Sequence, residues 1–309
     1  MDKKNVKLYD LVDLANPQDV LNELKHIIAL MVTDFDYALF EQIYNDTETI
    51  FQGEYTGYQG SNTKYHDLEH TCSVVLAAIR LMHGASVEGH SFSGKNILIG
   101  LLGALFHDIG FIQTDSDLTG SGAKYTVGHE ERSIDFMKHY LSKKTFSTQD
   151  ITDCSHTIMS TILALGINEV PFRSDDIKML GKIVGSADLL AQMADREYLE
   201  KLLMLYKEFE EAEVPGYGSE MELFEKTEDF YKYMALKRLS EECGGVSAYM
   251  RSHFRDRWDL DRDLYQESII GNIEYLKTIV ARCNKSFGCY MEHLRRGGIA
   301  EKRNDKKES

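Results

Sequence analysis

The sequence predicts an all-α protein, and three observations support this. Apolar residues recur every three or four positions along most of the 309-residue chain, as one buried face of a helix requires, and no useful stretch alternates as a half-buried strand does. Only three prolines occur, so long uninterrupted helices are allowed. Glycines gather mostly between the periodic segments, where they mark turns. We therefore expect a compact multi-helix bundle without internal repeats.

The first half of the chain divides into helices and glycine-containing breaks. In order, we expect helices over 8–50, a loop over 52–64, a helix over 67–82, a break over 84–94, an apolar helix from a cap at Asn96 to 107–108, a polar loop over 112–127, and helices over 127–141 and 147–165. Gly110 ends the apolar helix, which is apolar on nearly every side and should be buried.

The second half continues in the same way. We expect a long helix from a cap at Ser174 to about Phe209, a loop over 213–220, helices over 221–243, a break at 244–245 and a helix over 261–283. Residues 1–294 should form one domain, with its core at about 60–200. Residues 295–309 are charged and aperiodic, which predicts a disordered tail.

Composition excludes several classes of protein. The formal net charge of −15 argues against a nucleic-acid or anionic-membrane binder, which needs a basic face. The longest apolar run, 97–106, is shorter than the roughly 20 residues that span a bilayer. Five cysteines without a CxxC pair disfavour a disulfide framework, and the N-terminus has no apolar signal core. We expect a soluble cytoplasmic protein.

Histidines and aspartates at special positions are the candidate site. His66 and His70 are four residues apart and share a helical face, and the pair His107-Asp108 ends the buried helix, where adjacent side chains can converge. Asp188 falls on the apolar face of its helix, at i+4 from Val184. An unpaired buried carboxylate costs several kcal/mol, so Asp188 should meet a cation, a metal ion or several hydrogen-bond donors.

Two further histidines, His129 and His156, lie on helices where a second ion would need ligands. Each histidine alone could instead be a hydrogen-bonded core or capping residue, and Asp188 could form a salt bridge. Together the residues offer imidazole and carboxylate ligands without cysteine, which suits Mn, Fe, Co, Ni or Zn rather than Ca, and argues against a structural zinc site.

The ordered set His70, His107-Asp108, His129, His156 and Asp188 resembles the HD-domain metal-dependent phosphohydrolases. The segment Tyr65-His66-Asp67-Leu68-Glu69-His70-Thr71 is similar to the signature of class I cyclic nucleotide phosphodiesterases, of the same superfamily, which usually have Asn in the place of Asp67. The resemblance covers about residues 60–200. It implies an HD-domain fold with a buried metal centre.

The resemblance also implies roles. One divalent transition-metal ion would be held by His70, His107, Asp108 and Asp188. A second site, which could also take Mg, would be completed by His129 and His156. Asp108 would bridge the two ions. His66 would protonate the leaving oxygen. His156 is typical of the dinuclear HD branch rather than of the phosphodiesterases.

The function that follows is metal-dependent hydrolysis of a small anionic phosphoester, a nucleotide or cyclic nucleotide, by a metal-activated hydroxide with a histidine acid. Lys124, Arg132 and Arg173 are candidate phosphate contacts, and the loops 112–127 and 213–220 are candidate walls. One alternative is a di-iron oxygenase like myo-inositol oxygenase, and another is a non-catalytic nucleotide-binding HD protein. The sequence leaves the substrate and the oligomeric state open.

Overall fold

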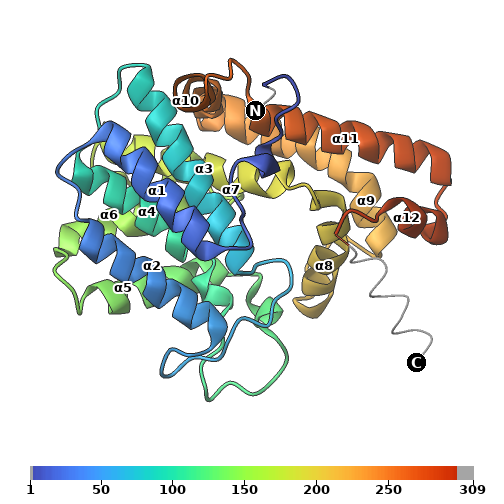
Figure 1. The fold of residues 1–309 in the computed structure, drawn as a ribbon. Helices are drawn as coiled ribbons and strands as arrows, with labels where there is room; N and C mark the ends of the chain where they lie inside the picture. Colours follow the sequence, from blue (N-terminus) through green and yellow to red (C-terminus); the bar gives the residue numbers. More distant parts are fainter. Residues whose placement is uncertain (1–2, 298–309) are drawn as a thin grey trace.

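The computed structural model describes residues 3–297, and it confirms the all-α prediction (Figure 1). The described part contains no strand; one isolated bridge joins Tyr58 and Thr114. The predicted disorder of 295–309 lies mostly outside the described residues. Arg296 and Gly297 are described, and the amide of Gly297 donates a hydrogen bond of 2.7 Å to Glu200.

The N-terminal half forms a bundle around the helix α3 (Leu68–Val87), which packs against α1 and α4 and against two later helices, α7 (Asp175–Ala194) and α10 (Tyr249–Trp258). Its elements are η1 (Leu8–Asp10), α1 (Pro17–Met31), α2 (Tyr37–Gln52), α3 (Leu68–Val87), α4 (Gly94–Phe106), η2 (Ile109–Phe111), η3 (Gly122–Tyr125), α5 (His129–Leu141), α6 (Thr148–Met159) and η4 (Ile167–Glu169). Most of α3 and nearly all of α4 is buried, as the apolar composition of α4 predicts.

The C-terminal half completes this bundle and places further helices on one side of it (Figure 1). Its elements are α7 (Asp175–Ala194), α8 (Tyr198–Glu211), α9 (Glu220–Asp229), the π-helical segments η5 (Phe230–Ala235) and η6 (Arg238–Glu242), η7 (Val246–Ala248), α10 (Tyr249–Trp258), α11 (Leu264–Cys283) and α12 (Phe287–His293). The helix α7 contacts both halves, since it packs on α3, α4 and α6 as well as on α11.

Several predicted boundaries were wrong for local reasons. The cap of α4 is Ser93, whose hydroxyl accepts a hydrogen bond from the amide of Asn96, so Asn96 lies inside the helix. The predicted helix 175–209 is two helices, because the chain turns at 195–197, where Asp195 accepts from the amide of Glu197. The helices α10 and α12 were not predicted.

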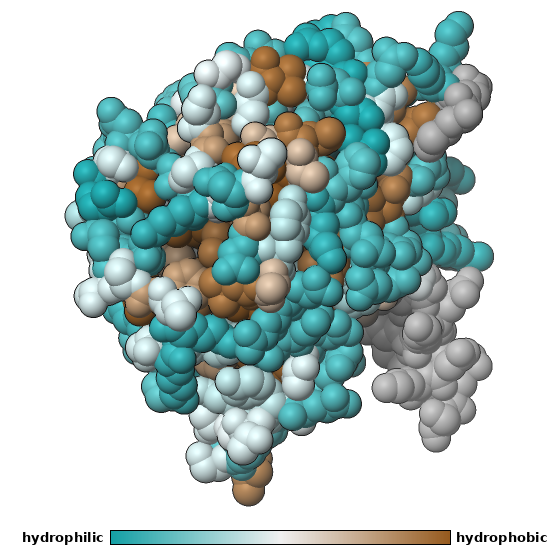
Figure 2. Space-filling view, turned by 60° about the vertical axis from the view of Figure 1, so that its left-hand side comes forward, coloured by the Kyte–Doolittle hydropathy of each residue, from teal (hydrophilic) through white to brown (hydrophobic). Residues whose placement is uncertain are grey.

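The cysteines differ in part from the expectation. Cys283 and Cys289 form a disulfide that joins the end of α11 to α12, whereas Cys72, Cys154 and Cys243 are free and buried. The face shown in Figure 2 is mostly hydrophilic, with apolar residues gathered in a few patches. Among the described residues, no helix is long and apolar enough to cross a membrane.

Candidate metal centre

His70 enters the site from the first turn of α3. Asp67 caps this helix, and its carboxylate accepts a 2.9 Å hydrogen bond from the amide of His70. The cap fixes where the helix begins. The His70 side chain is therefore held at the mouth of the bundle, and its Nε2 atom lies 3.4 Å from Asp108 Oδ2 and 3.3 Å from Asp188 Oδ1.

His107 and Asp108 follow the last residue of α4, where the chain turns into η2. This turn brings the two adjacent side chains together, with His107 Nε2 at 3.1 Å from Asp108 Oδ2. The other ring nitrogen, His107 Nδ1, donates a 2.9 Å hydrogen bond to the carbonyl of Ala104. Because a carbonyl can only accept, this bond leaves His107 Nε2 as the nitrogen that faces the site.

The helix α5 is fastened to this turn and carries His129. A Cβ atom on Gly110 would lie 2.0 Å from the carbonyl oxygen of His129, so only glycine permits this approach. Ser133 accepts a hydrogen bond from the Gly110 amide at 2.9 Å and donates to the His107 carbonyl at 2.6 Å. His129 Nε2 thereby lies 3.3 Å from Asp108 Oδ1, with its Nδ1 on the Thr126 carbonyl at 2.9 Å.

Asp188 reaches the group from α7. It is less buried than the sequence indicated, because its side chain is 23 % exposed and lines a cavity. Its Oδ1 atom lies 3.3 Å from His70 Nε2 and 3.8 Å from His107 Nε2. Three segments distant in the sequence, α3, the turn after α4 and α7, thus bring His70, His107, Asp108 and Asp188 together.

The donor atoms fit one divalent ion. Ligands about 2.1 Å from an ion lie roughly 3.0–3.5 Å from one another, close to the separations seen here. Suitable atoms of His70, His107 and Asp108 all lie within 4.8 Å of one another. His107 Nε2 and Asp108 Oδ2 are buried and have no hydrogen-bond partner. A buried polar atom without a hydrogen-bond partner lowers the stability of the folded protein, and one bound ion would give both atoms a partner.

The charges in this group shift the pKa values of its members. Burial disfavours the charged ring of His107, but Asp108 and Asp188 outweigh burial and raise its pKa to about 9. Burial opposes ionisation of Asp108, yet His107 and His66 bring its pKa well below the ordinary value. Burial would also raise the pKa of Asp188, but His70 and His107 outweigh this effect and lower the pKa. The carboxylates are therefore charged at neutral pH and ready to bind a cation.

His66 is placed by a residue that the sequence analysis did not single out. The turn before α3 carries His66, whose Nδ1 donates a 2.6 Å hydrogen bond to Glu208 Oε2 on α8. Glu208 Oε1 also accepts from the amides of Lys64 and Tyr65, at 2.8 and 2.7 Å. Glu208 is buried, so these bonds hold the His66 ring firmly.

The two carboxylates nearest to His66 in the sequence, Asp67 and Glu69, have other partners. Asp67 caps α3, and Glu69 pairs with Lys201 at 3.0 Å. The ring of Phe111 stacks on both His66 and His129, at 4.3 Å from each, and the two histidine rings lie 6.1 Å apart. Glu208, like Asp188, is a carboxylate on the apolar side of a helix, since it lies three positions after Leu205. The sequence pattern could therefore have indicated it as well.

A cavity of about 220 Å³ opens beside the group, lined by His66, His70, Asp108, His129 and Asp188. Its remaining walls are mostly apolar or aromatic and come mainly from α7, α8, α9 and the segments on either side of α9, with Tyr198, Phe209, Tyr217 and Phe230 among them. Gln192, Thr161 and Lys226 add polar groups. Of the two loops proposed as walls, 213–220 contributes Tyr217 and 112–127 contributes Thr126.

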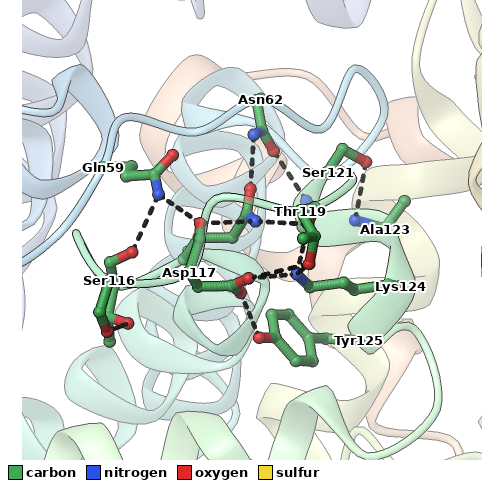
Figure 3. Close-up of polar contacts among 12 residues, drawn as sticks. Gln59, Asn62, Ser116, Asp117, Thr119, Ser121, Ala123, Lys124 and Tyr125 are labelled. Atoms are coloured by element: carbon green, nitrogen blue, oxygen red, sulfur yellow. Dashed lines mark hydrogen bonds and ion pairs between the residues drawn. The ribbon is translucent and has the colours of Figure 1, made fainter.

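The three basic residues predicted to contact phosphate have other partners. Lys124 pairs with Asp117 at 2.5 Å inside the loop network of Figure 3, and Arg173 pairs with the buried Asp153 at 2.7 Å. Arg132 donates to the carbonyls of Gly110 and Ile112 at 2.7 and 3.2 Å. None of the three lines the cavity. Their contacts stabilise the loop and the helices that carry the site.

His156 does not join the group within the described part of the protein. No ion pair or ring contact connects it to Asp108 or His129, and its ring lies edge-on to Phe172 at 6.1 Å. Its Nδ1 atom is buried without a hydrogen-bond partner, and burial lowers its pKa. Of the two ligands predicted to complete a second metal site, the structure places only His129 beside Asp108.

The fold and the site define an all-α protein with a candidate metal centre of histidine and aspartate. A family model described as Npun_R2479-like matches residues 52–244, more than half of the chain, so the protein belongs to the Npun_R2479-like family. The matched region contains every residue of the candidate centre and also Glu208. No curated protein matches the chain.

Proposed function

We propose that this protein is a metal-dependent phosphohydrolase of the HD-domain type, which cleaves a small organic phosphoester. One observation carries the proposal. Donor atoms of His70, His107, Asp108 and Asp188 converge from two helices and one turn, and two of them, His107 Nε2 and Asp108 Oδ2, are buried without a hydrogen-bond partner. The order of these residues along the chain resembles that of the HD superfamily.

The residues divide into ligands and a proton donor. A divalent ion held by the four ligands would supply Lewis acidity toward a phosphoryl oxygen and lower the pKa of water. His129 lies on the other oxygen of Asp108, so it would serve a second ion bridged by that carboxylate. Nitrogen and oxygen ligands of this set suit Mn, Fe, Co, Ni or Zn.

His66 supports the hydrolytic assignment because it lines the same cavity without contacting either aspartate at ion-pair distance. Glu208 holds its Nδ1, which leaves Nε2 free to give a proton to a leaving oxygen. The aromatic walls of the cavity fit a substrate with a flat or apolar group beside its phosphoester. A nucleotide or cyclic nucleotide has this form.

The test combines metal analysis with a phosphoester panel. The purified protein should contain a divalent transition metal and release product from phosphodiesters or phosphomonoesters. His66→Asn should keep the metal and lose about 10²–10⁴-fold in turnover, the usual contribution of a general acid. Asp188→Asn should lose the metal. His139→Asn, which changes an exposed histidine of α5, is the matched control and should behave as wild type.

Other outcomes assign other functions. Iron content with a mixed-valent signal and oxygen uptake would show a di-iron oxygenase. Tight binding of nucleotides without product release, with metal present, would show a non-catalytic binding protein. Loss of metal from His66→Asn would refute the proton-donor role, and a protein that binds no metal at all would refute the proposal.

A further inference from the structure

Two cysteines and a histidine meet where α11 is joined to α12. Cys283 is the last residue of α11, and Cys289 and His293 lie four positions apart on α12, so their side chains share one face of that helix. The link between the helices is three residues long, and two of them, Asn284 and Lys285, have left-handed backbone conformations. This sharp turn places α12 against α11 and brings the Cα atoms of the two cysteines within 5.4 Å (Figure 1).

The three side chains offer a set of metal-ligand atoms. The two cysteine sulfurs and a ring nitrogen of His293 all lie within 4.8 Å of one another. Among the described residues, one other group of histidine, cysteine and acidic side chains is as close together, and it consists of His70, His107 and Asp108 in the candidate metal centre. The two groups share no residue. The described chain therefore contains a second place where an ion could be held.

His293 has a ring nitrogen without a partner. Its Nε2 atom is buried and accepts or donates no hydrogen bond among the described residues, as is also true of His107 Nε2 in the candidate metal centre. Other groups hold α12 in place: the Tyr275 hydroxyl donates a 2.9 Å hydrogen bond to the His293 carbonyl, and the ring of Tyr290 lies against Phe224. An ion among the three side chains would give the buried nitrogen a partner.

In the structure the two sulfurs are joined in a disulfide, so metal binding requires reduction first. A dithiol reductant breaks the bond: it gives two electrons and two protons to the sulfurs and is itself oxidised to a disulfide. Zinc then displaces both thiol protons and binds the two thiolates, while neutral His293 supplies a lone pair from its ring. Cys289 and His293 are partly exposed, so a reductant and an ion can reach them.

The chemistry of the ligands selects zinc. Thiolate and imidazole are ligands that zinc prefers, whereas Mg, Ca and Mn favour oxygen. The group also lies at the carboxyl end of the 20-residue helix α11, where unpaired carbonyls carry a partial negative charge that favours a cation. Three protein ligands leave the fourth position of tetrahedral zinc to water.

We propose that Cys283, Cys289 and His293 form a zinc site when the disulfide is reduced. The connection between α11 and α12 is then a disulfide in the oxidised protein and a zinc ion in the reduced protein. The site differs in its ligands from the candidate metal centre, which contains no cysteine, and it does not depend on the function proposed for that centre.

The test compares the oxidised and the reduced full-length protein. Reduction uses a phosphine, which takes an oxygen atom from water as it is oxidised and competes less for zinc than a dithiol does. Reduced protein should bind one more equivalent of zinc than oxidised protein, and zinc should protect two thiols from alkylation. Cobalt in place of zinc should give the intense near-ultraviolet absorption of a cobalt–thiolate bond, which histidine and aspartate ligands cannot produce.

Variants locate the site. Cys289→Ser and His293→Asn should each weaken zinc binding to the reduced protein by about 100-fold, because each removes one of three ligands. The matched control is Glu292→Gln, which changes the exposed neighbour of His293 on the same helix and should bind as wild type. Asp188→Asn should keep the cobalt–thiolate absorption, even where it loses the metal of the other site. His293→Asn retains both cysteines and the disulfide, so it tests the site if Cys289→Ser does not fold.

Two results would overturn the proposal. One is equal zinc content in the oxidised and reduced wild-type protein, or cobalt that binds without thiolate absorption. The other is zinc binding by reduced His293→Asn that equals binding by wild type, which would remove the histidine from the ligand set.

Discussion

Glu208 holds the histidine proposed as the proton donor, and it does so from a helix more than 140 residues away in the sequence. Its carboxylate accepts three hydrogen bonds, from the His66 ring and from the amides of Lys64 and Tyr65. None of these contacts involves the residues proposed to bind metal. A change at Glu208 should therefore affect the position of His66 and leave the metal in place.

We expect Glu208→Gln to lower turnover by about 10- to 100-fold with unchanged metal content, the size of effect seen when a residue that orients a functional group is lost. The measurement is steady-state kinetics together with metal analysis. Glu211→Gln, which changes an exposed glutamate of the same helix, is the control. Unchanged turnover in Glu208→Gln would contradict the orienting role.

We expect the affinity for the proposed metal ion to depend on pH through His107. In the metal-free protein its pKa is about 9, raised by Asp108 and Asp188 against the effect of burial, so the ring carries an extra proton at pH 7. Since Nδ1 is bonded to the Ala104 carbonyl, that proton lies on Nε2, where the ion would bind. Metal binding must release it.

Apparent metal affinity should therefore rise about tenfold per pH unit between pH 6.5 and 9. Competition titrations against a chelator over this range measure the slope, and calorimetry in two buffers of different ionisation enthalpy counts the released protons. An affinity that is flat over this range, after correction for the chelator, would show that His107 is not a ligand.

At the scale of elements, the contact of α5 with the turn after α4 decides where His129 lies. Gly110 permits this contact, because a Cβ atom there would meet backbone atoms of His129 and Ser133 at 2.0 and 2.8 Å. Backbone atoms cannot move aside as a flexible side chain would. A larger residue must push α5 away from the turn and carry His129 away from Asp108.

Gly110→Ala should destabilise the protein by about 1–3 kcal/mol, the usual cost of overpacking, and should lower activity. Gly271→Ala is the matched control, since Gly271 is exposed in the middle of α11 and a Cβ atom there meets nothing within 4 Å. The control should stabilise by about 0.5–1 kcal/mol. Chemical denaturation measures both, and equal effects of the two changes would contradict the close approach.

For the whole molecule, the interface of α3 with α10 links stability to pH. His83 and His253 face each other there, with their Nδ1 atoms 3.1 Å apart. Burial lowers the pKa of His253 well below its ordinary value, helped by Arg80 and His83, and burial lowers that of His83, although Asp256 opposes it. Both rings are therefore neutral in the folded protein.

The unfolded chain binds more protons than the folded one below a pH of about 6.5, so the free energy of unfolding should fall as pH falls from 6.5 to 5. Each proton contributes about 1.4 kcal/mol per pH unit at most. Urea titrations of metal-free protein at several pH values measure this. His253→Gln should flatten the dependence, and an unchanged slope would show that the pair is not its source.

The sequence by itself determined the all-α class, most helices of the first half, and the choice of His70, His107, Asp108, His129 and Asp188. Helical periodicity is a local property, and a carboxylate or histidine on an apolar face is visible in the periodicity alone. Helix boundaries set by a single cap or turn, such as those at Ser93 and 195–197, were harder to predict, because neighbouring residues could also end or begin a helix.

Only the tertiary structure decided which residues meet. It paired His66 with Glu208, left His156 against Phe172, and gave Lys124, Arg132 and Arg173 partners away from the cavity. It also buried Arg80 without a carboxylate. The physical reason is that such pairings depend on how helices distant in the sequence pack, and the periodicity of one helix does not contain that information.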